Sequence, residues 1–223
     1  MGLETLNDTI LKCNKCPRLR EWCFQQEGSK KKFENETYWK LPLPGFGDRD
    51  ARVLITGLAP AAHGGNRTGR VFTGDTSGEY LFSALYRHGF SNRKDSLYRN
   101  DGLTLTDVYI TNVVKCAPPK NRPDASEFHT CSPFLIEEMR QLKQVKVILA
   151  LGGQAFDKTR RVLKDMGADV GGSAFGHGVT YNLGPGFPIL AGSYHPSLYN
   201  INTRRVTPAM LDDVFESIKK YLC

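Results

Sequence analysis

The fold of this chain is decided by the stretch Val53-Leu-Ile-Thr-Gly-Leu-Ala-Pro-Ala-Ala-His-Gly-Gly-Asn-Arg-Thr-Gly-Arg-Val-Phe-Thr-Gly-Asp75. Its apolar start predicts a buried strand and a helical pattern follows its end, so residues 57–75 form the loop after the first strand of an α/β unit. Open α/β sheets bind ligands at such loops. Its glycines allow close backbone approach to a ligand. Three side chains carry donors suited to phosphate or carbonyl oxygens: Asn66, Arg67 and Arg70. A glycine-rich surface loop without a ligand is the alternative, because neither Gly-x-Gly-x-x-Gly nor a Walker A motif is present.

Predicted strands and helices alternate along the rest of the chain. Four apolar segments predict strands over residues 52–57, 108–114, 145–151 and 188–192. Apolar residues at helical spacing predict helices over 3–12, 76–87, 124–142 and 154–166, with a last helix that begins at Thr207 and Pro208. This alternation predicts an α/β fold in three layers, α/β/α, around a central, mainly parallel four-stranded sheet. No linker or repeat divides the sequence, so we expect a single domain over residues 1–223.

The charge balance favours a polyanionic partner. Thirty Lys and Arg residues against 23 Asp and Glu residues give a formal net charge of +7, although basic proteins that bind no nucleic acid are also common. The run Lys30-Lys-Lys32 is typical of a solvated loop rather than of a dedicated phosphate contact. No segment has 18 consecutive apolar residues, and the N-terminus lacks the apolar run of a signal peptide. We therefore expect an intracellular, cytoplasmic protein that does not contact membranes.

The six cysteines comprise two pairs and two single residues: Cys13-x2-Cys16, Cys116-x14-Cys131, Cys23 and Cys223. In an intracellular chain such a set indicates a metal site rather than disulfides. Four thiolates can bind either a structural zinc ion or a [4Fe-4S] cluster, and spacing does not distinguish the two. The apolar pattern of helix 124–142 turns Cys131 toward the interior, where a metal ligand can lie.

Two polar residues occupy positions where α/β proteins place ligands. His195, in Ser193-Tyr-His-Pro-Ser197, follows the last predicted strand and faces the same sheet edge as the glycine-rich loop. A histidine in a turn is otherwise a hydrogen-bonded structural residue. Asp75 opens the helix after the glycine-rich loop, where its ordinary role is that of N-cap. A carboxylate that faces a ligand is the functional alternative.

Three motifs occur in a specific order: Gly57-Leu-Ala-Pro60 with Thr73-Gly-Asp75, Cys116-Ala-Pro-Pro-Lys-Asn121, and His195-Pro-Ser197. Together with the cysteine pairs they closely resemble the uracil-DNA glycosylase superfamily, and in particular its iron–sulfur branch, family 5 (type b). The resemblance extends from Cys13 to about Arg205. It implies a DNA repair hydrolase that flips uracil out of DNA, and other deaminated bases such as hypoxanthine, and cleaves the glycosidic bond to leave an abasic site.

The resemblance also implies a role for individual residues. A structural [4Fe-4S] cluster would be held by Cys13, Cys16, Cys116 and Cys131. His195 would donate a hydrogen bond to uracil O2, while Asp75 and Asn121 would have supporting catalytic roles. The base would lie against Gly57, Ala59, Phe72 and Asn112, although Phe72 could be a plain core residue and Asn112 could merely satisfy backbone groups. Contacts to DNA are expected from Arg67, Arg70, Ser197, Arg204 and Arg205.

One departure and two rival interpretations accompany this resemblance. Leu58 stands where the related family 4 enzymes have an acidic residue, and it cannot activate water. The first rival is a non-catalytic, metal-stabilised DNA-binding protein. The second is a relative that traps DNA covalently through a histidine-bearing insert, but the segment 120–124 has no such insert and His129 lies on a predicted helix. We expect a monomer that acts on DNA.

Overall fold

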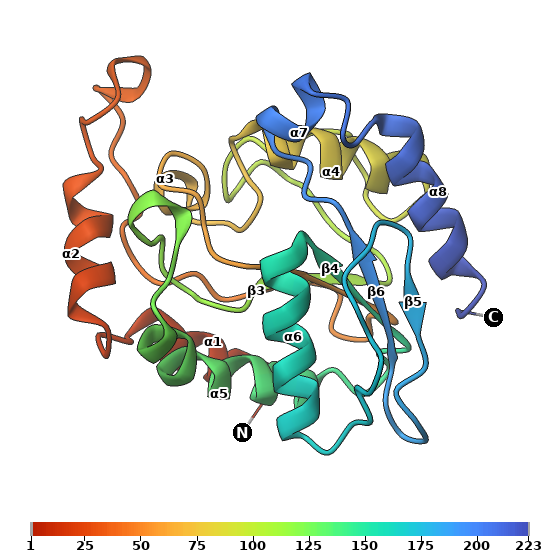
Figure 1. The fold of residues 1–223 in the computed structure, drawn as a ribbon. Helices are drawn as coiled ribbons and strands as arrows, with labels where there is room; N and C mark the ends of the chain where they lie inside the picture. The colour runs from red at the N-terminus through yellow and green to blue at the C-terminus, as the bar shows by residue number, and fades with distance from the viewer. Residues whose placement is uncertain (1, 223) are drawn as a thin grey trace.

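Four parallel strands form the centre of a six-stranded sheet (Figure 1). The computed structural model describes residues 2–222, so Cys223 lies outside the described residues. The strand order is β1-β3-β2-β4-β6-β5. The parallel strands are β2 (Val53–Gly57), β3 (Val108–Asn112), β4 (Val147–Leu151) and β6 (Ile189–Ser193). Two antiparallel edges, β1 (Phe46–Gly47) and β5 (Thr180–Tyr181), complete the sheet.

Helices cover both faces of the sheet (Figure 1). The face formed by alternate residues such as Ile55 and Leu149 packs against α4 (Thr76–Arg87) and α8 (Pro208–Lys219). The opposite face, with Leu54 and Ile148, packs against α6 (Gly153–Asp165) and the layer of α5 (Ala125–Gln141) and α1 (Leu3–Leu11). Because both faces are buried, the parallel strands consist of continuous apolar runs rather than alternating polar and apolar residues.

The structure confirms the three-layer α/β architecture and the mainly parallel four-stranded centre. Helix α4 has the predicted bounds, and Thr207 caps α8 by accepting a hydrogen bond from the Met210 backbone. The other predicted elements differ from the observed ones by one or two residues at their ends.

Several short elements were not predicted. They are the two edge strands, α2 (Pro17–Gln25), α3 (Gly65–Thr68), α7 (Leu198–Asn202), and the 3-10 turns η1 (Lys31–Phe33) and η2 (Pro119–Asn121). A strand of two residues or a helix of four or five residues is too short for an apolar period to appear. Helix α2 has nine residues but buries only Leu19 and Cys23, so its pattern is weak.

One buried ion pair joins the end of β3 to α5. Lys115 Nζ lies 2.6 Å from Glu138 Oε2, and the two side chains are 1% and 0% exposed. Glu138 also accepts from Thr111 Oγ1 at 3.0 Å, and Lys115 Nζ donates to the backbone oxygen of Asn112 at 2.8 Å. A buried pair is tolerated when its remaining hydrogen-bonding groups are satisfied in this way.

Among residues 2–222, no helix combines the length and the apolar character needed to cross a membrane.

Candidate active site

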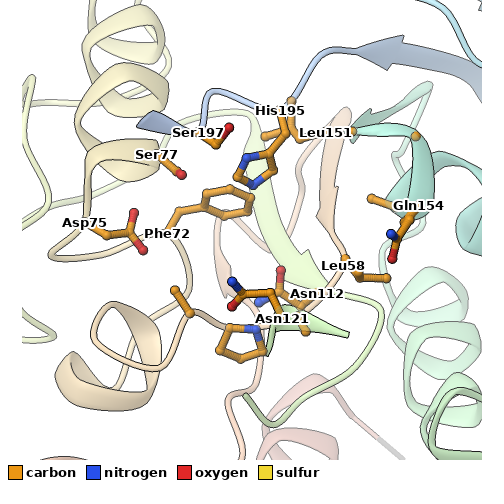
Figure 2. A pocket seen from close by; sticks show the side chains of 16 residues that line it. Leu58, Phe72, Asp75, Ser77, Asn112, Asn121, Leu151, Gln154, His195 and Ser197 are labelled. Carbon is orange, nitrogen blue, oxygen red and sulfur yellow. The ribbon is translucent and has the colours of Figure 1, made fainter. Parts of the chain in front are cut away.

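A cavity of about 420 Å³ opens at the carboxyl edge of the sheet (Figure 2). All four parallel strands deliver residues to it, because the carboxyl ends of parallel strands lie at one edge. Loop residues 58–61 follow β2, Asn112 ends β3, residues 151–155 join β4 to α6, and His195 and Ser197 follow β6. The topology therefore brings together residues that are more than 130 positions apart in the sequence.

Gly57 creates the space at the inner end of this cavity. A Cβ atom at Gly57 would lie 2.3 Å from Asn112 Oδ1 and 2.8 Å from the ring of Phe72, so only glycine permits both side chains to approach the strand. Asn112 is 2% exposed, and its side-chain amide makes no hydrogen bond with any residue of the described chain. Buried amides are normally paired. The Asn112 amide is thus available to a ligand with both donor and acceptor groups.

Phe72 and His195 form a wall of the cavity. Their ring centroids lie 5.9 Å apart with an angle of 31° between the planes, and Figure 2 shows the imidazole beside the phenyl ring. Phe72 has a φ of 51°, which is unusual for a bulky residue and costs conformational energy that the surrounding structure must offset. Backbone strain of this kind is concentrated at functional sites.

His195 is held as a neutral group. Burial lowers the pKa of its imidazole to about 4, so at pH 7 the ring is uncharged and has one N–H donor. Its backbone oxygen accepts from Asn200 Nδ2 at 2.8 Å. Its Cβ packs on Gly152, where a φ of 95° requires glycine. A neutral imidazole can stabilise a developing oxyanion without first taking up a proton.

Asp75 combines the two roles considered from the sequence. Its Oδ1 accepts from the Gly78 backbone at 2.9 Å and so caps α4. Its side chain also lines the cavity, and burial raises the pKa of the carboxyl above its ordinary value. The cap uses one oxygen atom, and Oδ2 lies against Gly64, where a Cβ would approach within 2.0 Å.

The loop after β3 brings a further amide to the cavity. Asn121 ends η2 with a φ of 56°, directly after Lys120 with a φ of 54°. Two consecutive non-glycine residues in the left-handed region form a turn that places Asn121, exposed at the surface, in the lining of the cavity. Ala59 and Leu58 line the side next to the end of β2.

Arg70, which was expected to contact DNA, makes its contacts inside the protein. Its side chain is 6% exposed and lies 2.7 Å from Asp101 Oδ2, and Nη2 also donates to Ser96 Oγ at 2.7 Å. This guanidinium braces the segment 96–101 against the glycine-rich loop, and the expected direct phosphate contact is not the role its geometry favours. Asp101 also accepts from the backbone of Leu97 and Leu103. Burial acts to raise the pKa of its carboxyl, but the Arg70 guanidinium and these two backbone donors together hold that pKa well below the usual range.

Arg67 is likewise used inside the protein. It lies 2.6 Å from Glu36 Oε2 and donates to the backbone oxygens of Gly74 and His63 at 2.9 and 2.8 Å. Its side chain is 11% exposed. Arg67 therefore joins the glycine-rich loop to the segment that precedes it, and the expected direct phosphate contact is not the role its geometry favours.

The segment after His195 presents its side chains to solvent. Ser197 lines the cavity and caps α7 by accepting from the Asn200 backbone at 3.3 Å. Arg204 and Arg205 are exposed, and the Arg205 guanidinium lies 4.9 Å from the centroid of the Tyr194 ring. Leu198 and Tyr199 on α7 are also exposed. The phosphate contacts expected from the two arginines stay a prediction.

Sequence reasoning missed two polar residues of the cavity. Ser77 lies in the first turn of α4, two residues after Asp75, and Gln154 lies in the first turn of α6. Gln154 follows Gly152 and Gly153 directly after the third predicted strand. The rule that ligands bind at the carboxyl edge could have identified it.

The four paired cysteines line a second, small cavity. Cys13 follows α1, Cys16 precedes α2, Cys116 follows β3, and Cys131 lies on α5. No group of three His, Cys, Asp or Glu side chains within residues 2–222 is arranged to hold a single metal ion. The four thiols nevertheless surround one cavity, and the Lys115 backbone N–H donates to Cys131 Sγ at 3.3 Å. Four convergent thiols, one with a backbone donor, fit the ligand set of a [4Fe-4S] cluster.

Comparison with known proteins agrees with this geometry. The family model of the uracil DNA glycosylase superfamily matches residues 44–219. This chain belongs to that superfamily.

It is 46% identical over 221 residues to a protein of Mycobacterium leprae named type-5 uracil-DNA glycosylase, with 98% of this chain and 95% of the relative covered. A Thermus thermophilus protein of the same name is 42% identical over 220 residues, covering 99% and 98%. A type-4 uracil-DNA glycosylase of Saccharolobus solfataricus is 30% identical over 227 residues, covering 99% and 87%. The resemblance to the type-5 group of the superfamily is confirmed.

The protonation of His195 can be measured directly. We expect its imidazole resonances to titrate with a midpoint near pH 4, against about 6.5 for an unperturbed histidine. In the unfolded chain His195 has the higher, unperturbed pKa and so takes up its proton first as the pH falls. The free energy of unfolding should therefore decrease as the pH falls from about 6.5 to 4. His195→Gln assigns the resonance, and a midpoint above 6 would show that the ring is solvated.

Proposed function

We propose that this chain is a monofunctional uracil-DNA glycosylase that excises uracil from DNA by base excision repair chemistry and leaves an abasic site. The observation that carries the proposal is a single cavity that combines the neutral His195, the Phe72 ring and the unpaired Asn112 amide. A flipped pyrimidine needs stacking on its face and hydrogen bonds on its edge. All of these groups come from one chain, which supports action as a monomer, and we assign the protein to the cytoplasm.

The chemistry follows from the charges that develop during cleavage. Breaking the glycosidic bond places negative charge on the departing base, so a donor at uracil O2 stabilises the transition state more than the ground state. His195 is that donor. The Asn112 amide pairs with the O4 and N3 edge of uracil, and Phe72 packs on the base.

The sugar lies on the other side of the cavity. Asp75 faces C1′, where its carboxylate stabilises the positive charge of the oxocarbenium-like transition state and positions a water molecule. Leu58, next to the base, takes no part in the activation of water. Asn121 supports Asp75 at the mouth of the cavity. No lysine nucleophile is assigned, so no strand cleavage follows excision.

Uracil-containing DNA, incubated with the protein and then heated in alkali, tests the proposal. We expect cleavage at the uracil position. His195→Ala should slow uracil removal by roughly 100 to 1000-fold, the typical cost of removing a donor to a developing oxyanion. Unchanged DNA would favour a non-catalytic DNA-binding protein, and an adduct resistant to SDS would favour covalent trapping. His129→Ala, on the exposed face of α5, is the matched control and should retain full activity.

Hypoxanthine excision tests how catalysis is divided among the site residues. A purine gains less from a donor placed for uracil O2, so its removal should depend on several groups together. We expect the wild-type protein to remove hypoxanthine as well as uracil. We expect Asp75→Ala or Asn121→Ala to slow hypoxanthine removal by a larger factor than the same substitution slows uracil removal. Single-turnover rates on both substrates measure the two factors. Equal factors would assign Asp75 to a step common to both bases, or to helix capping alone.

We also propose that Cys13, Cys16, Cys116 and Cys131 hold a structural [4Fe-4S] cluster. Their convergence on one cavity and the N–H···S hydrogen bond to Cys131 support this assignment. When bound, the cluster would cross-link α1, α2, β3 and α5 without any electron transfer, which glycosidic cleavage does not require. Cys23, whose Sγ lies 3.6 Å from the Ala117 backbone oxygen, packs beside this site and is not assigned as a ligand.

Anaerobic purification tests the cluster. We expect a brown protein with broad visible absorbance and about four irons per chain, as four-thiolate ligation of such a cluster requires. Cys131→Ser should lose most of the colour, whereas Cys23→Ser should keep it. A colourless protein with one zinc ion per chain would overturn the assignment.

A further inference from the structure

A second groove adjoins the cavity that we assign to the base. It has a volume of about 320 Å³, and Ala61, Asp75 and Asn121 line both hollows. On one side it is lined by α4 and the glycine-rich loop. On the other side it is lined by Lys30, Lys32 and Phe33. These three residues belong to residues 28–37, which we call the arm; the arm follows α2 and projects beyond it at the upper left of Figure 1.

Arg67 fixes the arm against the glycine-rich loop. Its guanidinium lies 4.0 Å from the centroid of the Phe33 ring and forms an ion pair with Glu36, so it contacts the arm at two points. The same guanidinium donates to the backbone oxygen of Gly74, the residue before Asp75. The arm is therefore held next to the site and is not a free surface loop.

The two lysines of the groove contact an aromatic ring of the arm. Lys30 Nζ and Lys32 Nζ lie 5.4 and 5.2 Å from the Phe33 ring centroid, and neither forms an ion pair with any residue between 2 and 222. Lys31, between them, is exposed but does not line the groove. All three lysines are exposed, as expected of a solvated loop, and two of them also line one groove.

His63 adds a hydrogen-bonding imidazole to the same groove, and burial lowers the pKa of this ring, with a further contribution from Lys30 and Arg67. Its Nδ1 lies 2.9 Å from the Tyr38 hydroxyl, and its Nε2 makes no hydrogen bond within the described chain. If Tyr38 donates to Nδ1, the ring carries its proton on Nε2 and can donate it to an anion in the groove. The acidic residues of the groove, Asp75 and Glu79, come from the α4 side, opposite the arm.

We propose that this groove binds the DNA backbone phosphate next to the flipped nucleotide, with Lys30, Lys32 and His63 as its ligands. The inference rests on the proposed function, because it requires a nucleotide whose base occupies the first cavity and whose sugar lies near Asp75 and Asn121. These two residues and Ala61 form the shared rim, so a strand that leaves the cavity over this rim enters the groove. Lysine ammonium groups and a histidine N–H are suitable partners for a phosphate.

Salt-dependent binding tests the charge contribution. The ligand is DNA with 2′-fluorodeoxyuridine, whose electronegative substituent disfavours positive charge at C1′ and so prevents cleavage. Each lost phosphate contact lowers the slope of log K against log salt by about 0.9 on duplex DNA. Lys30→Gln with Lys32→Gln should therefore reduce the slope by about one to two units. Lys31→Gln with Lys143→Gln, which removes the same charge from exposed sites outside the groove, should reduce it by less than half as much.

Neutral methylphosphonate linkages locate the contact. Each DNA carries one such linkage at a different position along the strand. A linkage within two nucleotides of the uracil should weaken DNA binding by the wild-type protein several-fold. The same linkage should not further weaken DNA binding by the Lys30→Gln, Lys32→Gln double variant. The inference would be overturned if, at every position, the linkage and the two lysine substitutions weakened DNA binding by independent factors that multiply. It would also be overturned if the double variant had the same slope of log K against log salt as the control pair. If the wild-type protein removes uracil and either of these two results is found, only the phosphate site in the groove is refuted. If the wild-type protein does not remove uracil, the proposed function is refuted.

Discussion

The ion pair between Lys115 and Glu138 constrains the whole carboxyl end of β3. Within five residues the chain passes from Asn112, whose amide faces the base cavity, to Cys116, which lines the cysteine cavity. Lys115 holds the Asn112 backbone oxygen with its side chain and donates its own N–H to Cys131. Breaking a buried pair by removing one partner costs about 3–5 kcal/mol. Neither cavity can therefore change shape at this strand without disturbing the other.

A second set of contacts connects the cysteine cavity to the groove beside Asp75. Cys16 stands directly before α2, α2 leads into the arm, and Arg67 fastens the arm to the loop that carries Asp75. A cluster that held Cys16 would fix the base of this connection. Its structural contribution would then extend to the groove, although the groove is formed by residues that bind no metal. The N-terminal segment thus lines the groove that adjoins the cavity of Asp75 and Asn121.

Patterns that depend on local sequence predicted the fold well. The Thr207 cap, the following Pro208 and the apolar spacing of α4 are local signals, and the structure confirms each of them. The rule that parallel strands end at one edge correctly brought Asn112 and His195 to a common cavity. The arginines could not be assigned in this way, because the partner of Arg70 is Asp101 and that of Arg67 is Glu36, each about 30 residues distant. Only tertiary structure distinguishes an arginine that braces the interior from one that faces solvent. Local sequence likewise does not show that two lysines of the arm line the groove.

Four glycines determine the shape of the site through the atom that they lack. The Asn112 amide lies against Gly57, the Asp75 carboxylate against Gly64, the Phe72 backbone oxygen against Gly78, and the His195 side chain against Gly152. Every missense change at a glycine codon adds at least a Cβ carbon. The set of positions at which a substitution disturbs this site is accordingly larger than its set of functional side chains, because it includes four residues that carry no side chain at all.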